Sequence, residues 1–142
     1  AGGIATGRGM LAAMVLGADA VQIGSRFVAS EESSAHINFK NTVVQTEDGG
    51  TDLTLKELTP VRLIKNEFYQ KVQKLYSQKA DKEDLVKLLG RARAKKGMFE
   101  GDLNEGELEI GQIAGLIHKI KPASEIVNEI ITDFSRVKSE IR

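Results

Sequence analysis

The sequence predicts an α/β fold in which the last strands of a parallel β/α structure precede a mainly helical region. Three observations support this prediction. A glycine-rich start, AGGIATGRG, leads into the apolar helix-forming run MLAAMVL at Met10–Leu16. A short apolar segment, AVQI at Ala20–Ile23, follows between turn signals. Beyond residue 45 the apolar residues recur at spacings of three and four, the period of an amphipathic helix.

The first 24 residues are interpreted as the end of a strand, a loop, a helix and a second strand. Ala1–Ile4 ends the first strand, Gly17 closes the helix at Met10–Leu16, and Ala20–Ile23 is the second strand. This order is the back half of a βαβ unit, whose strands are parallel. Because the sequence offers these strands no parallel partner, we expect the chain to be the C-terminal part of something larger.

The remainder is predicted to be mainly helical. Ser25–Gln45 is expected to be helical, at least from Ser33 onward, and Asp81–Leu89 is expected to be capped by Asp81. Two further helices are expected, one opened by Pro60 and carrying an apolar stripe, and one spanning Pro122–Ile141.

Composition narrows the class of protein. The 142 residues include 20 basic and 20 acidic ones, and this balance argues against a nucleic-acid partner. Cysteine is absent, so there is no disulfide, thiolate metal site or thiol nucleophile, and we predict no metal site. No apolar run approaches the ~18 residues of a membrane span. The start lacks the pattern of a signal peptide, so we predict no membrane partner and a cytoplasmic location.

Glycines follow both predicted strands. Gly2 and Gly3 follow the first strand, and Gly24 and Ser25 follow the second, about 20 residues later. Backbone N–H groups at such turns can converge on an anion, and a hydroxyl can donate to a phosphate oxygen. In a (β/α)8 barrel the loops after strands seven and eight often hold a phosphate group. The alternative is that these glycines serve only as turn residues, and their spacing leaves both interpretations open.

A dinucleotide fingerprint of the Rossmann type is excluded. Gly7, Gly9 and Asp19 resemble it superficially, but the glycine spacing is wrong. Asp19 also precedes its strand, whereas the ribose-binding acid of that fold lies at the C-terminal end of the second strand.

Several longer motifs carry a family resemblance. The stretch AGGIATGRGMLAAMVLGADAVQIGSRFVASEESSAH resembles the flavin-binding end of the nitronate monooxygenase family, also called 2-nitropropane dioxygenase-like. The flavin-type enoyl-acyl-carrier-protein reductase belongs to the same superfamily. IMP dehydrogenases and other phosphate-binding barrels share the AGGI part. The combination with QIGSRF, EESSAH, PVRLIKN and ELEIGQIAGLI is more specific and extends over almost the full length.

The resemblance implies the C-terminal part of a (β/α)8 TIM barrel with noncovalently bound FMN. It assigns residues 1–45 to strands seven and eight with their phosphate loops, and residues 46–142 to a mainly helical region that covers the flavin. By motif, the FMN phosphate is surrounded by six residues: Gly2, Gly3, Gln22, Ile23, Gly24 and Ser25. The resemblance also brings Gln112 toward the flavin or substrate. It places the family's catalytic histidine upstream of Ala1, so the catalytic residues are unknown here.

The activity implied is that of an FMN-dependent oxidoreductase, first a nitronate monooxygenase that oxidises alkyl nitronates with oxygen. The alternative on the same scaffold is an enoyl-acyl-carrier-protein reductase or a quinone reductase, in which NADH is the electron donor. A non-enzyme alternative is a truncated helical interaction fragment that binds no flavin. The partner is a small molecule in the enzymatic readings, and a homodimer is left open.

Other polar residues receive structural interpretations. His36 is favoured as a hydrogen-bonding residue at a helix start, and His118 as an exposed residue at a helix end. Glu31 and Glu32 are expected to stabilise a helix start. Arg26 and Arg62 are open to either a phosphate contact or a salt bridge. The basic run Arg91–Lys96 is expected to face solvent, and the acids of Glu100–Glu109 do not match a calcium loop.

Overall fold

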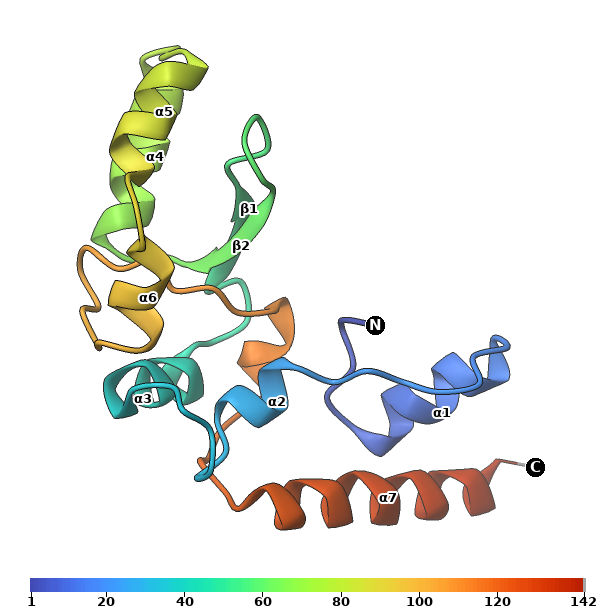
Figure 1. Cartoon of the computed structure of the whole chain (residues 1–142). Coiled ribbons are helices and arrows are strands. Elements are labelled where there is room, and N and C mark those ends of the chain that lie inside the picture. The colour runs from blue at the N-terminus through green and yellow to red at the C-terminus, as the bar shows by residue number, and fades with distance from the viewer. Residues whose placement is uncertain (142) are drawn as a thin grey trace.

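The computed structural model describes residues 1–141 and combines helices with a small sheet (Figure 1). The elements in chain order are α1 (Gly7–Val15), α2 (Ser25–Val28), α3 (Ile37–Gln45), β1 (Thr51–Thr54), β2 (Val61–Ile64), α4 (Glu67–Ser77), α5 (Lys82–Leu89), α6 (Arg93–Met98), the 3-10 helix η1 (Gln112–Leu116) and α7 (Ala123–Glu140). The expected mixture of helices and strands is therefore confirmed.

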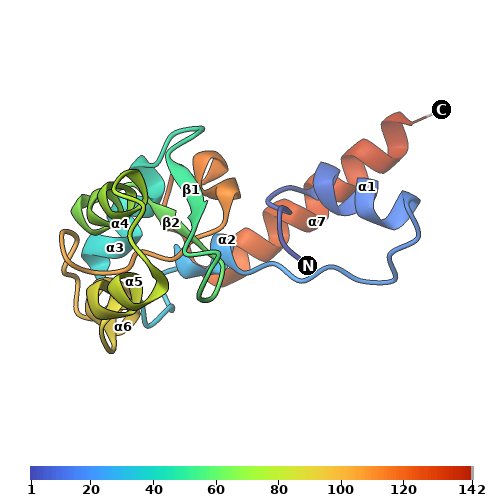
Figure 2. The same cartoon turned by 90° about the horizontal axis from the view of Figure 1, so that it is seen from above.

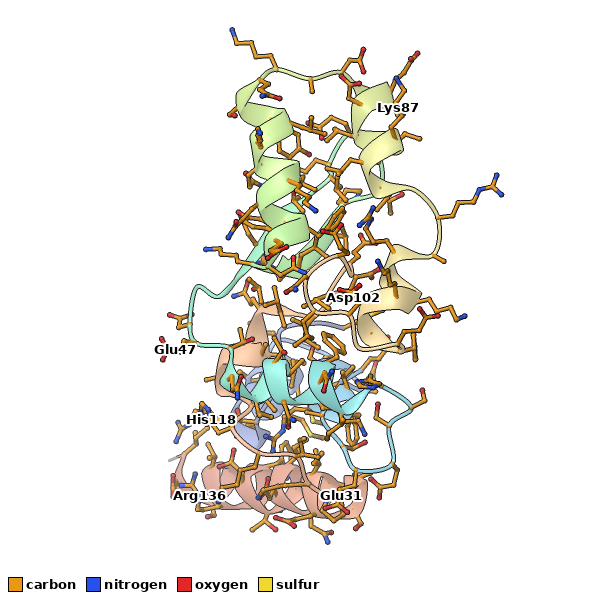
Figure 3. All side chains as sticks on the ribbon, turned by 90° about the vertical axis from the view of Figure 1, so that its left-hand side faces the viewer. Glu31, Glu47, Lys87, Asp102, His118 and Arg136 are labelled. Atoms are coloured by element: carbon orange, nitrogen blue, oxygen red, sulfur yellow. The ribbon has the colours of Figure 1, made fainter. Side chains whose placement is uncertain are left out.

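The molecule is elongated. Helices α4, α5 and α6 gather with the β1–β2 hairpin at one end, while α1 and α7 lie together at the other (Figures 1 and 2). Helices α2, α3 and η1 lie between them. In Figure 3, Lys87 lies near one extremity, and Glu31 and Arg136 lie near the other.

Two hydrophobic clusters stabilise the fold. The cluster under α4 and α5 consists of Leu55, Leu63, Phe68, Val72 and Leu85. The larger cluster draws on segments far apart in sequence: Ala5, Ala29, Phe39, Val43, Ile64, Leu108, Ile110, Ile113, Ala114 and Ile117. This second cluster packs Ala5, which follows the glycine-rich start, together with Ile113 and Ala114 of η1. Burial of apolar surface, at about 25 cal/mol per Å², stabilises the contact between these distant segments.

The predicted helix opening at Pro60 is wrong in its first part. Val61–Ile64 is strand β2, which pairs antiparallel with β1 in a register that places Thr51 opposite Ile64. Leu63 also bridges Glu109 on the other side of β2. Pairing with β1 in a hairpin and with the distant Glu109 overrides the three-residue spacing of Val61 and Ile64. The helix itself begins at Glu67.

Three predictions for the N-terminal third are also corrected. Ala1–Ile4, expected to end a strand, contains no strand residue. Residues 20–23, expected as a strand, run as an extended trace that pairs with no strand among residues 1–141 (Figure 1). Ser25–Gln45 divides into α2 and α3. The interruption has a tertiary cause, because Ser30 forms a parallel bridge with Lys121 and the Glu31 N–H donates to the Lys121 carbonyl at 3.0 Å.

Local signals predicted other boundaries correctly. Asp81 caps α5 by accepting from the Asp84 N–H at 3.0 Å, and Gly90 ends the helix with a positive φ of 63°. The last helix, α7, follows Pro122 as expected. In the described part of the chain, no helix combines the length and the apolar character needed to cross a bilayer.

Candidate functional site

The start of α2 is joined to the segment before η1 by a side-chain hydrogen bond. The Gly111 N–H donates to Ser25 Oγ at 3.0 Å. A Cβ at position 111 would lie 2.7 Å from the same oxygen, so a side chain there would require the Ser25 hydroxyl to move. Because a hydroxyl can accept and donate at once, Ser25 keeps its own hydrogen for another acceptor.

An open pocket lies beside this hydrogen bond, and we call it the Ser25 pocket. It has a volume of about 400 Å³ and is lined by Gly24 and Ser25 from the start of α2, Arg62 from β2, and Glu109 and Gly111 from the segment before η1. Apolar side chains, including Val28 and Val61, complete its wall. The pocket therefore unites residues from three distant parts of the sequence.

Backbone pairing places Arg62 and Glu109 at this pocket. The Ile110 N–H donates to the Arg62 carbonyl at 3.1 Å, which holds the segment 107–111 along β2. The guanidinium of Arg62 donates to the carbonyl and the hydroxyl of Thr51 at 3.3 and 3.2 Å. Neither residue is among the six assigned to the phosphate by motif, although a phosphate contact was one of the two interpretations left open for Arg62; the strand pairing brings both to the pocket.

Two glutamate side chains of the segment 107–111 have raised pKa values. Burial, reinforced by the neighbouring Glu109 charge, raises the pKa of Glu107 to about 7. Burial also raises the pKa of Glu109. No hydrogen bond acts on either carboxyl within residues 1–141. Each is therefore easier to protonate than an ordinary glutamate.

Of the six residues assigned to the phosphate by motif, Gly24 and Ser25 line the Ser25 pocket, whereas Gly2, Gly3, Gln22 and Ile23 are not among its lining residues. Gly2 and Gly3 have positive φ values of 79° and 73°, and a Cβ built on either would meet open space. Their segment passes close to the extended trace that leads into α2 in both views (Figures 1 and 2). Both glycines are exposed. Their conformation, which favours glycine, leaves the backbone accessible to a ligand.

The remaining predicted site residues lie on the same trace or nearby. Gln22 and Gly24 are exposed and Ile23 is half-buried. The Gly24 carbonyl accepts from the N–H groups of Phe27 and Val28 at 2.9 and 3.1 Å, which fixes the first turn of α2. Gln112 is exposed at the start of η1, next to Gly111.

The structural interpretations of the other polar residues can be compared directly. His36 caps α3, since its Nδ1 accepts from the Asn38 N–H at 3.1 Å, and His118 is exposed at the molecular surface (Figure 3). Arg26 forms a salt bridge with Glu129 at 2.8 Å. Glu32 does stabilise a helix start, but of α7, because its carboxylate accepts from the Ala123 N–H at 2.9 Å.

Comparison with known proteins identifies the class to which this fold and site belong. The family model "Nitronate monooxygenase" matches residues 1–133. The chain belongs to the nitronate monooxygenase family, and the resemblance inferred from its motifs is confirmed. Its relatives in that family support an oxidoreductase.

Individual relatives agree with this assignment. A probable nitronate monooxygenase of Staphylococcus saprophyticus is 34% identical over 140 residues, covering 90% of this chain and 39% of the relative. A nitronate monooxygenase of Neurospora crassa is 29% identical, covering 92% of this chain and 35% of the relative. The chain thus spans less than two fifths of the length of these curated relatives.

Solved structures extend the likeness. FabK from Thermotoga maritima superimposes with a TM-score of 0.89 and 38% identity, covering 98% of this chain and 44% of FabK. The nitroalkane oxidase of Streptomyces ansochromogenes gives a TM-score of 0.74 and 26% identity, covering 99% of this chain and 40% of that protein.

Proposed function

We propose that this chain is part of an FMN-dependent oxidoreductase and that the Ser25 pocket belongs to its phosphate-binding site. The proposal assigns the FMN phosphate to Gly2, Gly3, Gln22, Ile23, Gly24 and Ser25. It also makes residues 1–45 the end of a TIM barrel and residues 46–142 the cover of the flavin. The observation that carries it is the Ser25–Gly111 hydrogen bond, which leaves the Ser25 hydroxyl hydrogen free beside an open pocket.

The residues present fit a phosphate group. Open space lies where a Cβ would stand at Gly2, Gly3 and Gly24, so backbone amides there can approach an anion closely. Ser25 contributes a hydroxyl donor, and Arg62 contributes a guanidinium at the pocket wall. Glu109 is the acidic group among them, and burial raises its pKa.

The chemistry of such an enzyme resides mainly in its cofactor, since FMN when bound accepts and returns the electrons. The residues of this chain bind and orient: glycine amides and Ser25 hold the phosphate end, and the segment 107–111 closes one side of the pocket. The histidine that the family uses in catalysis is assigned upstream of Ala1. In this proposal the chain therefore supplies phosphate binding and not the catalytic histidine.

Nitronate oxidation is the first candidate activity. It is supported by the family model that matches residues 1–133 and by the names of the curated relatives. In this reading an alkyl nitronate anion is oxidised and oxygen is reduced.

Reduction of an enoyl thioester is the second candidate, and a specific observation favours it. FabK, which we take to represent the reductase branch of the superfamily, is more similar to this chain than the nitroalkane oxidase in both TM-score and identity. In this reading NADH is the electron donor.

The test uses the protein that contains this chain, expressed in full. We expect it to be yellow with bound FMN, and we expect Ser25→Ala to weaken FMN binding about 10-fold, because a hydrogen bond to a charged group is lost. Ser25→Thr keeps the hydroxyl, and Ser124→Ala, on an exposed turn of α7, is the matched control. A colourless protein that takes up no FMN would favour the non-enzyme alternative. Turnover of propionate 3-nitronate or of NADH with an enoyl thioester then decides between the two substrates.

A further inference from the structure

Glu109 occupies a fixed place in the Ser25 pocket. It lies two residues before Gly111, whose N–H bonds Ser25 Oγ at 3.0 Å, and it is held on its other side by the bridge to Leu63 of β2. Its side chain lines the same open pocket as Ser25 and Arg62. A carboxyl group is therefore held beside the residues assigned to the phosphate.

The carboxyl of Glu109 has no internal partner. No hydrogen bond from the described residues acts on it, and burial is the cause of its raised pKa. Nearby acids that serve structure are paired: Glu105, for example, accepts from Lys71 and Arg93. A partly buried carboxyl without a partner, at the wall of a pocket, is available to a ligand.

We propose that Glu109 controls, through its charge, how tightly the Ser25 pocket holds the phosphate group of FMN. The inference rests on the proposed function. It gives Glu109 a role in phosphate affinity, although Glu109 is not one of the six residues assigned to the phosphate by motif.

Three charged groups bear on the surroundings of Glu109, one of them only through Glu107. Glu107 lies on the same segment, Arg62 comes from β2, and Arg93 from α6 acts on the carboxyl of Glu107. Arg93 is directed toward the carbonyls of Leu88, Leu89 and Glu105. Arg62 is therefore the cation that lines the pocket with Glu109, and Glu107 is the neighbouring acid whose pKa the Glu109 charge raises.

The direction of the effect follows from these charges. When Glu109 is protonated, its O–H can donate to a phosphate oxygen. When it is ionised, it repels the phosphate dianion across a partly desolvated pocket. The contribution of Glu109 to FMN affinity is therefore favourable while its carboxyl is protonated and becomes unfavourable as it ionises. The phosphate itself loses its second proton near pH ~6, and the dianion binds backbone amides more tightly than the monoanion does. This change has the opposite sign to the effect of Glu109. The effect of Glu109 is therefore measured as the difference in FMN affinity between the unchanged protein and Glu109→Gln at each pH.

The experiment measures FMN and riboflavin binding to the full-length apoprotein by flavin fluorescence, at pH about 4, below the ordinary glutamate pKa, and at pH about 8.5. We expect Glu109→Gln to bind FMN about 3- to 10-fold more tightly than the unchanged protein at the higher pH, and within about twofold at the lower. Riboflavin, which lacks the phosphate, should bind both proteins alike. Glu105→Gln is the matched control, because Glu105 is paired and lies outside the pocket.

The outcomes separate this inference from the proposed function. The role of Glu109 is overturned if Glu109→Gln and the unchanged protein bind FMN equally at both pH values. It is also overturned if Glu109→Gln binds riboflavin more tightly to the same extent as FMN. Neither result would contradict the proposed function. Failure of the unchanged protein to bind FMN overturns the proposed function and this inference with it. If Glu109→Gln does not fold, Glu109→Leu removes the same charge and undergoes the same comparison.

Discussion

Gly7 of α1 lies directly against the backbone of α7 at Phe134, with no space for a side chain between the two helices. A Cβ at Gly7 would stand 2.7 Å from the carbonyl carbon of Asp133 and closer still to Phe134 N and Ile130 O. The contact is reinforced by the Arg8 N–H, which donates to Asp133 Oδ2 at 2.9 Å. The first helix and the last are therefore joined backbone to backbone.

Gly7→Ala is expected to separate these helices and to lower the free energy of unfolding by about 2–3 kcal/mol, because backbone atoms cannot move aside as side chains do. Gly9→Ala, in the same helix, is the control. Its new Cβ would meet only Thr6 and Ile4 at 3.6 and 3.7 Å, so alanine should stabilise α1 by up to about 1 kcal/mol. Urea unfolding monitored by circular dichroism compares the two, and equal stabilities would contradict the close helix contact.

Asn66 is expected to tolerate aspartate poorly although aspartate is an equally good helix cap. Its Oδ1 caps α4 at the Tyr69 N–H, while its Nδ2 donates to the carbonyls of Leu103 and Gly106, both at 2.8 Å. Asn66→Asp keeps the cap but directs a carboxylate oxygen at two carbonyls, at a cost of about 2–3 kcal/mol. The reverse exchange at an exposed cap, Asp81→Asn, should change stability by less than about 0.5 kcal/mol. A thermal melt of Asn66→Asp that matches the unchanged protein would show that the two carbonyl contacts contribute nothing.

Tyr69 and Asp52 form a hydrogen bond whose contribution depends on pH. The Tyr69 O–H donates to Asp52 Oδ2 at 2.7 Å; burial first, and Asp52 second, raise the Tyr69 pKa from 10.0 to about 12. A raised phenol pKa stabilises the fold fully below the unfolded value of about 10 and loses that effect as pH rises toward about 12. Tyr69→Phe should cost about 1–2 kcal/mol at neutral pH, and the difference should shrink across this alkaline window. Unfolding midpoints measured at a series of pH values test this, and a constant difference would refute it.

Glu107→Gln is expected to stabilise the protein at neutral and alkaline pH. The Glu107 side chain is only 8% exposed, and its pKa is raised from 4.5 to about 7. Because the folded state favours the protonated carboxyl, the cost of ionisation is absent below about pH 4.5 and complete above about pH 7. The variant should gain up to about 3 kcal/mol above pH 7 and nothing at acidic pH. Glu105→Gln should act in the opposite direction, since ion pairs lower the Glu105 pKa. If the difference in free energy of unfolding between Glu107→Gln and the unchanged protein does not change with pH, ionisation of Glu107 does not destabilise the folded state.

Only part of the candidate site could be predicted from the sequence. Gly24 and Ser25 follow from a local motif, because a tight turn and a helix start use neighbouring residues. Arg62, Glu109 and Gly111 could not be assigned to the same pocket, since they meet Ser25 only after β2 has paired with the segment 107–111. The hydrogen bond between the Gly111 N–H and Ser25 Oγ joins residues 86 positions apart.

The sequence by itself determined the features that depend on near neighbours. Asp81 and Gly90 delimit α5 and His36 begins α3, because these caps are satisfied within a few residues, and Pro122 fixes the backbone just before α7. Tertiary structure alone decided that Val61–Ile64 is a strand. It also decided that Arg93, expected in solvent, lies 4.6 Å from the ring centre of Phe68. The physical reason is that strand pairing and side-chain burial reward contacts between distant segments, and these contacts override the weaker local preferences of each segment.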